Sequence, residues 1–281
     1  MTLLDRIAEC NDWEPARFVP FVVAGAPVGH VRDDMVPTLA THGDVFCVDD
    51  DSVHLSERFA DFDARTEAVA GVVSALSDAG QLLPLVSELY PVRAHGAAPP
   101  LLALERAALT AFGVRSQGVH MNGFVRRPDG LHMWIARRSR HKPTWPGKLD
   151  NMVAGGQPMG LSVRENLAKE CGEEAGIPPE LAARAVPTGA VSYRHAHPCG
   201  LKHDLLHLFE LELPEDFVPA PQDGEVESFE LWPAARALQT AAETTDFKFN
   251  CPLAIIEFGL RHGLIGPEHP DYLALRAGTR G

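Results

Sequence analysis

The sequence lacks any apolar run of about 18 residues, the length that a helix needs to cross a bilayer. We therefore expect no transmembrane helix and no membrane partner. The first residues, Met1 to Arg6, lack a basic stretch followed by an apolar core, so no secretion signal is expected. Cysteine is scarce and scattered, at positions 10, 47, 171, 199 and 251. This pattern suits reduced thiols and predicts a cytoplasmic location.

Basic residues are also few. The chain carries 25 Lys and Arg against 38 Asp and Glu, a formal net charge of −13. This charge argues against non-specific nucleic-acid binding and against anionic membranes. It does not argue against a phosphate ligand, because a bound metal ion can reverse the charge of a site.

With 281 residues, the chain has room for two modest domains, each with its own core. Residues 1–110 predict an α+β domain of unassigned role, with helices at 3–10 and about 63–79 and a strand at 18–23. The small, Pro-rich segment 95–100 is the best candidate for a domain boundary. Residues 101–112 then predict a linking helix that Gly113 stops.

Residues 111–281 predict a second domain in which strands come first and helices follow. Strands are expected at 119–125 and 131–137, on either side of a turn at 126–130. A further strand is expected at 203–213, where apolar residues alternate. A C-terminal helical tail includes a helix at 252–262.

The segment from 154 to 177 carries the strongest chemical signal. Ser162 and Glu165 have the spacing of a capping box, so a helix should begin there, and Gly176 is a natural cap at its end. On this helix Glu170, Glu173 and Glu174 project within an arc of about 100°. A divalent cation such as Mg²⁺ would turn the repulsion between these carboxylates into oxygen coordination. The alternative is a solvated acidic face.

This segment resembles the Nudix box, a loop–helix–loop signature of metal-dependent diphosphate hydrolases. Two positions depart from it, because Leu161 replaces the first Glu and Lys169 replaces an Arg. The positions that match in register are Gly155, Glu170, Cys171, Glu173, Glu174, Gly176 and Ile177.

Further segments resemble the thiamine pyrophosphokinase-related subgroup of Nudix hydrolases, in which both departures are the usual form. These segments are 18–29, 88–92, 118–123, 142–151, 223–229 and 247–272. The resemblance implies a Nudix α/β/α sandwich with a mixed sheet, preceded by a smaller α+β N-terminal domain. It also implies hydrolysis of a small organic diphosphate to a monophosphate and phosphate, with thiamine diphosphate or its oxidised analogues as the expected substrates.

The resemblance assigns Glu170, Glu173 and Glu174 as metal ligands, for Mg²⁺ or, in its place, Mn²⁺. It makes Glu225 a further ligand or a general base, although an ordinary turn carboxylate is an equal alternative. Lys169 would orient Glu170 or pair with Glu173. The sequence leaves the oligomeric state open, and a homodimer is compatible with it.

We expect the substrate to contact Gly155 and Gly156 in the loop before the helix. Arg137, Arg138 and Lys142 are candidates for the diphosphate, because guanidinium and ammonium groups bind phosphate oxygens. Each has a solvated side chain as its alternative. Two aromatic residues, Trp145 and Tyr193, could stack on a substrate ring or simply pack in the protein.

Two other functions are compatible with the fold that the resemblance implies. An isopentenyl-diphosphate isomerase is suggested by residues 142–147, but residues 154–156 lack the reactive cysteine of those enzymes. A non-catalytic diphosphate-binding module is suggested by the loss of the first Glu, against which the three helix glutamates weigh. A group of His and Cys residues has no spacing typical of zinc sites. These residues are His195, His197, Cys199, His203 and His207.

Overall fold

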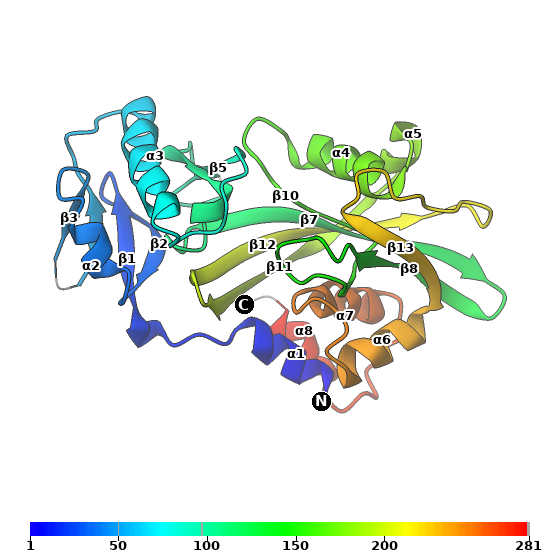
Figure 1. Cartoon of the computed structure of the whole chain (residues 1–281). Coiled ribbons are helices and arrows are strands. Elements are labelled where there is room, and N and C mark those ends of the chain that lie inside the picture. Colours follow the sequence, from blue (N-terminus) through cyan, green and yellow to red (C-terminus); the bar gives the residue numbers. More distant parts are fainter. Residues whose placement is uncertain (50, 97, 280–281) are drawn as a thin grey trace.

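The structure is a computed structural model that describes residues 1–49, 51–96 and 98–279. It has mixed α+β architecture, in which helices cover both faces of a long twisted sheet and a smaller module lies at one end (Figure 1). No helix in this described part is long and apolar enough to span a membrane.

The central sheet contains seven strands in the order β11-β12-β7-β8-β13, with β10 paired to β7 and β9 to β8. Strand β12 runs parallel to β7 and the other pairs are antiparallel, so the sheet is mixed as predicted. The strands are β7 (Arg115–Arg127), β8 (Gly130–Arg138), β9 (Leu149–Asp150), β10 (Val153–Gly156), β11 (Val186–His197), β12 (Gly200–Glu212) and β13 (Val226–Pro233).

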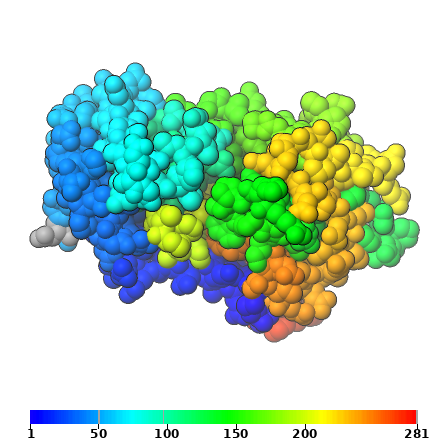
Figure 2. All heavy atoms as spheres, in the orientation of Figure 1, coloured from blue at the N-terminus to red at the C-terminus, as the bar shows by residue number. Residues whose placement is uncertain are grey.

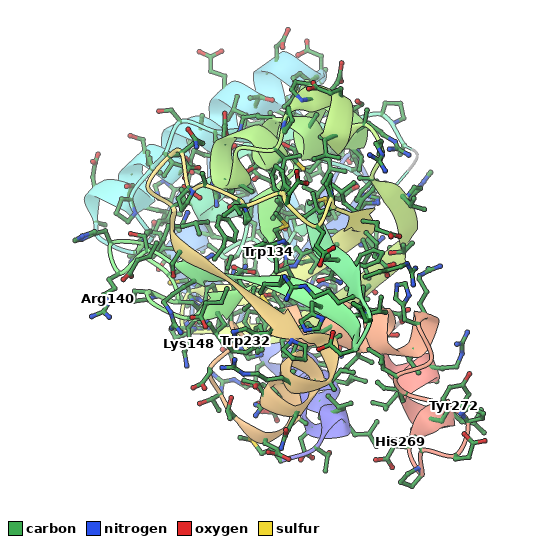
Figure 3. The ribbon with its side chains drawn as sticks, turned by 90° about the vertical axis from the view of Figure 1, so that its right-hand side faces the viewer. Trp134, Arg140, Lys148, Trp232, His269 and Tyr272 are labelled. Carbon is green, nitrogen blue, oxygen red and sulfur yellow. The ribbon has the colours of Figure 1, made fainter. Side chains whose placement is uncertain are left out.

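Each face of this sheet packs on its own set of helices, because successive strand residues point to opposite faces. On one face lie α4 (Val163–Ala175) and α5 (Pro179–Ala182), and on the other α6 (Ala234–Glu243), α7 (Cys251–Arg261) and α8 (Tyr272–Gly278). Trp134 of β8 packs in the cluster beneath α4, whereas Trp232 of β13 packs in the cluster with α6 (Figure 3). This is the α/β/α sandwich expected from the sequence.

Helix α1 (Leu3–Cys10) lies beside the C-terminal helices rather than in the N-terminal module. Ile7 and Cys10 are buried in the same cluster as α7. The Arg6 side chain is also buried and donates to the backbone oxygens of Ala241 and Thr244. The chain therefore starts on the larger body before it enters the smaller module.

The N-terminal module has its own sheet, in the order β2-β1-β4-β3, with β1 and β4 parallel. Its own apolar cluster includes Phe21, Phe46 and Phe112. In Figure 2 the module and the larger body meet in one continuous surface. Its elements are η1 (Pro15–Arg17), β1 (Phe18–Val23), β2 (Ala26–Arg32), α2 (Val36–Ala40), β3 (Phe46–Val48), β4 (Val53–Leu55), α3 (Phe62–Asp78), β5 (Leu89–Val92), β6 (Leu102–Glu105) and η2 (Arg106–Ala108).

The segment predicted as a boundary and a linking helix is neither. Strands β5 and β6 pair antiparallel, so residues 95–100 lie in the connection of this pair; within it, residue 97 is outside the described part. The predicted helix 101–112 is strand β6 followed by the short 3₁₀ helix η2. Residues Leu102 to Leu104 are all buried, and a short apolar run of this kind fits a buried strand as well as a helix.

Candidate functional site

The glutamate-bearing helix α4 begins and ends where its sequence predicts. Ser162 and Glu165 form the capping box, and Gly176 ends the helix in the left-handed conformation at φ 63°. Leu167, Cys171 and Ala175 bury the inner face of the helix against the sheet. Cys171 is therefore a core residue, and the neighbouring positions carry the glutamates.

The Glu170 carboxyl lies directly over the backbone of Gly155 in β10. A Cβ atom at Gly155 would come within 2.2 Å of the Glu170 carboxyl carbon, so no residue larger than glycine fits without displacing that carboxyl. The Glu170 side chain is only 13% exposed. Burial raises the pKa of this carboxyl, an effect that Lys169 partly offsets and that Glu173 and Glu225 reinforce.

Glu174 is the most deeply buried of the three, with 6% of the residue exposed. Its carboxylate accepts a hydrogen bond of 2.8 Å from the backbone N–H of Ala154. Burial raises the pKa of Glu174 well above its ordinary value, and Glu170 and Glu225 reinforce the shift. A cation would relieve this cost of burying like charges together.

Glu173 points to solvent and pairs with Lys169 at 2.6 Å, while the Lys169 ammonium lies 3.3 Å from Glu170. Lys169 thus pairs with Glu173 as the sequence suggested, and its orienting of Glu170 stays a prediction. The three glutamates are not gathered as a finished cage. Among the described residues, a metal-like group needs three His, Cys, Asp or Glu side chains whose ligand atoms all lie within 4.8 Å of one another. None of the three glutamates belongs to such a group.

Glu225, just before β13, is brought close to this helix. Its charge perturbs the pKa values of both Glu170 and Glu174. Burial raises the pKa of Glu225, but Lys142, Arg106 and Arg138 together outweigh burial, and the pKa is lowered. Glu225 therefore lies near enough to Glu170 and Glu174 for its charge to act on both, and Lys142 pairs with it.

The N-terminal module adds side chains that the sequence did not reveal. A Cβ at Gly156 would come within 1.8 Å of the Tyr90 hydroxyl, so Tyr90 of β5 lies against the loop before α4. Arg106 bonds to Glu88 at 3.0 Å and is close enough to Glu225 for each to shift the pKa of the other. Their sequence signal is weak, because a lone Tyr in a strand and a lone Arg after one are common.

The predicted substrate-binding side chains have different surroundings. Arg138 is buried, bonds to Asp150 at 2.9 Å and also donates to the backbone oxygens of Thr144 and Trp145. Arg137 donates to the Gly147 oxygen. Both hold the loop that carries Lys142 and Trp145, which occupies the centre of the face shown in Figure 2, while Arg140 and Lys148 of the same loop are labelled in Figure 3.

The two predicted aromatic contacts lie in the apolar cluster with α7, Tyr193 fully and Trp145 partly buried. The Tyr193 hydroxyl donates to Asp204 at 2.5 Å and accepts from Asn250 at 2.9 Å. The Trp145 ring lies 5.1 Å from the Phe249 ring, with the Lys202 and Lys248 ammonium groups 5.3 and 6.0 Å from its centre. These surroundings give Tyr193 a packing role, and stacking of a ligand on Trp145 stays a prediction.

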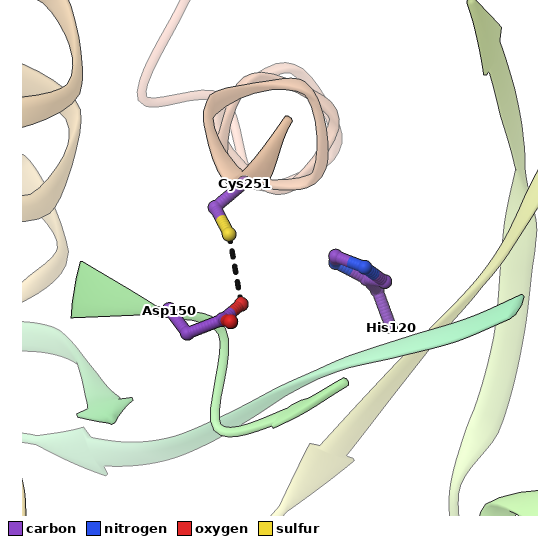
Figure 4. Close-up of side chains that lie close together, drawn as sticks. All are labelled: His120, Asp150 and Cys251. Carbon is purple, nitrogen blue, oxygen red and sulfur yellow. Dashed lines mark hydrogen bonds between the residues drawn. The ribbon is translucent and has the colours of Figure 1, made fainter. Parts of the chain in front are cut away.

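A second polar group, buried on the α7 side of the sheet, consists of His120, Asp150 and Cys251 (Figure 4). The Cys251 thiol donates to Asp150 at 2.8 Å, and Arg138 and Lys248 lie 2.9 and 3.8 Å from the same carboxylate. Burial, together with Lys248, lowers the pKa of His120 to about 4. Because two cations already balance Asp150, this group is better described as a closed hydrogen-bond network than as a metal site.

Comparison with known proteins agrees with this geometry. A NUDIX domain family matches residues 117–251, and a domain of unknown function (DUF4743) matches residues 2–116. Nudix hydrolase 20, chloroplastic, of Arabidopsis thaliana is 44% identical over 282 residues, which cover 96% of this chain and 75% of that protein. Nudix hydrolase 24, chloroplastic, of the same plant is 42% identical and covers 97% of this chain and 76% of that protein.

Among solved structures, the NUDIX domain of Shewanella oneidensis NrtR complexed with ADP ribose is similar over 54% of this chain and 90% of that one. Its sequence identity is 16% and its TM-score 0.42. The chain belongs to the Nudix hydrolases. It is a Nudix diphosphate hydrolase, a class that generally uses divalent metal ions.

Proposed function

We propose that this protein uses Mg²⁺ to hydrolyse a small organic diphosphate, thiamine diphosphate or an oxidised analogue of it, to the monophosphate and phosphate. The proposal depends chiefly on the Glu170 carboxyl seated over Gly155 beside Glu174 and Glu225. Glu170, Glu173 and Glu174 would hold the ion. When bound, it would neutralise charge on the diphosphate and lower the pKa of a water molecule.

The chain's own residues fit a metal and a diphosphate together. Lys169 pairs with Glu173 and lies beside Glu170, so it keeps the site balanced until a cation displaces it. Arg106 and Lys142 supply positive charge beside Glu225: Lys142 forms an ion pair with it, and both residues lower its pKa. Hydrolysis at phosphorus needs this kind of charge neutralisation and positioning more than covalent help from the protein.

The surroundings of Trp145 favour one kind of organic group. Two ammonium groups lie within about 6 Å of its ring, so a positively charged ring stacked on it would be repelled. Thiamine diphosphate carries a cationic thiazolium ring, whereas oxidation of that ring to a neutral form removes the charge. Within the proposed substrate class, the neutral oxidised analogues are therefore favoured.

The isomerase alternative has no support in this site. Ala154, Gly155 and Gly156 occupy the segment where that reaction needs a cysteine, and Cys171 is fully buried on the inner face of α4. A binding module without catalysis would not need the buried, mutually repelling carboxylates of Glu170 and Glu174.

The test compares Glu173→Gln with Glu180→Gln in the full chain, using phosphate release from thiamine diphosphate and its neutral oxidised analogue with Mg²⁺. Glu173 is exposed and half of a surface ion pair, so its replacement should leave the fold intact. We expect turnover to fall by roughly a hundredfold or more. Glu180, an exposed residue of α5, should tolerate the change.

Full activity of Glu173→Gln would refute the metal-ligand assignment. Cleavage of nucleoside diphosphate sugars or dinucleoside polyphosphates, without cleavage of either thiamine compound, would keep the hydrolase mechanism and reject the substrate.

A further inference from the structure

A cavity of about 290 Å³ lies between the N-terminal module and the start of the central sheet. It shares no lining residue with the carboxylate site, and β5 separates the two: Tyr90 lies against Gly156, whereas Pro91 lines the cavity. The cavity is cationic in a protein with a net charge of −13, because none of its described lining residues is acidic. Its polar lining includes His30, Arg93, His95, Arg115, Arg194 and His203.

Three of these residues form a row across the sheet. Arg194 of β11 is directly opposite His203 of β12, and His203 is directly opposite Arg115 of β7. Directly opposed residues of neighbouring strands project to the same face. The row therefore presents two guanidinium groups on either side of a histidine, with no acidic residue among the described residues that line the cavity, and this arrangement suits an anion.

The hydrogen-bonding groups of this row point to the same conclusion. Arg115 lies with its Nε 3.3 Å from His203 Nε2, which leaves His203 Nδ1 without a partner. Arg194 Nε and His30 Nδ1 are also buried without partners. His203 is only 9% exposed, and buried polar atoms are normally hydrogen-bonded. Three residues that line this basic cavity thus each carry a buried nitrogen atom without a hydrogen-bond partner.

The electrostatic state of the histidines agrees with this. Burial, followed by Arg194, Arg115 and His30, lowers the pKa of His203 to about 4. Burial and Arg194 also lower the pKa of His30. Asp204, the next residue along β12, bonds instead to Ser116 and Tyr193. Because His203 Nε2 accepts from Arg115, the proton of the neutral imidazole is on Nδ1, which is the nitrogen left free to donate to an anion.

We propose that this cavity is a second ligand site, which binds the phosphate group of a small molecule between the two parts of the protein. Arg194 and Arg115 would bind the oxygens, with His203 and His30 as further donors. The volume leaves room for an organic group next to the phosphate. This site is independent of the proposed hydrolysis, because it needs neither the glutamates nor a metal.

The test measures binding of inorganic phosphate and of phenyl phosphate to the full-length protein in EDTA, by titration calorimetry. Without metal, the carboxylate site repels both anions, so binding reports on the cavity. We expect Arg194→Gln and Arg115→Gln each to weaken binding about tenfold or more. Arg126 lies at the far end of β7, the strand that carries Arg115, and forms an exposed ion pair with Glu212. The Arg126→Gln variant should therefore bind phosphate as the unmodified protein does.

The two phosphates distinguish the sources of the ligand. Tighter binding of phenyl phosphate indicates an organic ester, and equal or tighter binding of inorganic phosphate indicates the free ion. Absence of binding at millimolar anion would overturn the proposal, as would equal weakening by Arg126→Gln. If Arg194→Gln fails to fold, Arg115→Gln, whose residue is exposed, decides the question.

Discussion

The Glu170 carboxyl and the Gly155 backbone occupy adjoining space, and this contact explains why a glycine is needed fifteen residues before the glutamate. The missing Cβ is what admits the carboxyl. Because the atoms in conflict belong to the Glu170 side chain, a larger residue would move that side chain more than it would disturb the backbone.

We expect Gly155→Ala to lower metal affinity and kcat/KM by at least about tenfold, as loss of a positioned ligand does. Gly172→Ala is the matched control, because no atom lies within 4 Å of the added Cβ. That change should stabilise α4 by up to about 1 kcal/mol. Steady-state kinetics and a Mg²⁺ titration would check both, and an active Gly155→Ala would show that Glu170 is not a ligand.

Glu174 predicts a dependence on pH. The pKa of the Glu174 carboxyl is raised in the folded protein. The protonated carboxyl therefore contributes its full stability below the pKa that Glu174 has in the unfolded chain, and this stability is lost as the pH rises through the pKa in the folded protein. In EDTA, Glu174→Gln should therefore be more stable than the unmodified protein at pH 8 and equal to it near pH 5. Mg²⁺ should reverse the order at pH 8, because it binds the carboxylate. Unfolding by urea at both pH values would measure this, and equal stabilities at pH 8 would contradict it.

At the scale of elements, helix α4 and the strands β1, β7, β8 and β12 follow from local sequence. Its cap residues and glycines have direct physical meaning, so both ends of α4 were predicted correctly. The segment 101–112 was predicted wrongly, because three adjacent apolar residues are compatible with a helix or with a strand buried beneath α3. The pairing with β5 decides between the helix and the strand, and the local periodicity of the sequence cannot predict that pairing.

The same limit applies to the site. The helix glutamates are near in sequence, so their common face could be predicted. Tyr90 and Arg106 approach from β5 and η2, and no spacing rule connects them to α4. The β5–β6 pair thus contributes to a site whose signature lies about 65 residues further along the chain.

At the scale of the whole molecule, Arg6 connects the N-terminal helix α1 to the end of helix α6. Its guanidinium donates to the oxygens of Ala241 and Thr244 from a position that is 4% exposed. We expect Arg6→Ala to reduce the free energy of unfolding by about 3 kcal/mol, since the buried carbonyl of Ala241 and the half-buried carbonyl of Thr244 lose a charged donor. Arg17→Ala, at an exposed ion pair, should leave it nearly unchanged. Urea denaturation would measure both, and equal small effects would show that α1 is only loosely attached.

The position of α1 changes how the smaller module should be regarded. Because the chain starts on the α7 side of the sandwich and returns to it at β7, the module is anchored at both of its ends, as a domain inserted into a host would be. A shortened chain that starts at residue 101 would lack helix α1, which belongs to the larger body, as well as most of the N-terminal module. A chimera in which residues 13–114 are exchanged between relatives, with α1 kept, would instead transfer the whole module. Tyr90 and Arg106 would be transferred with it.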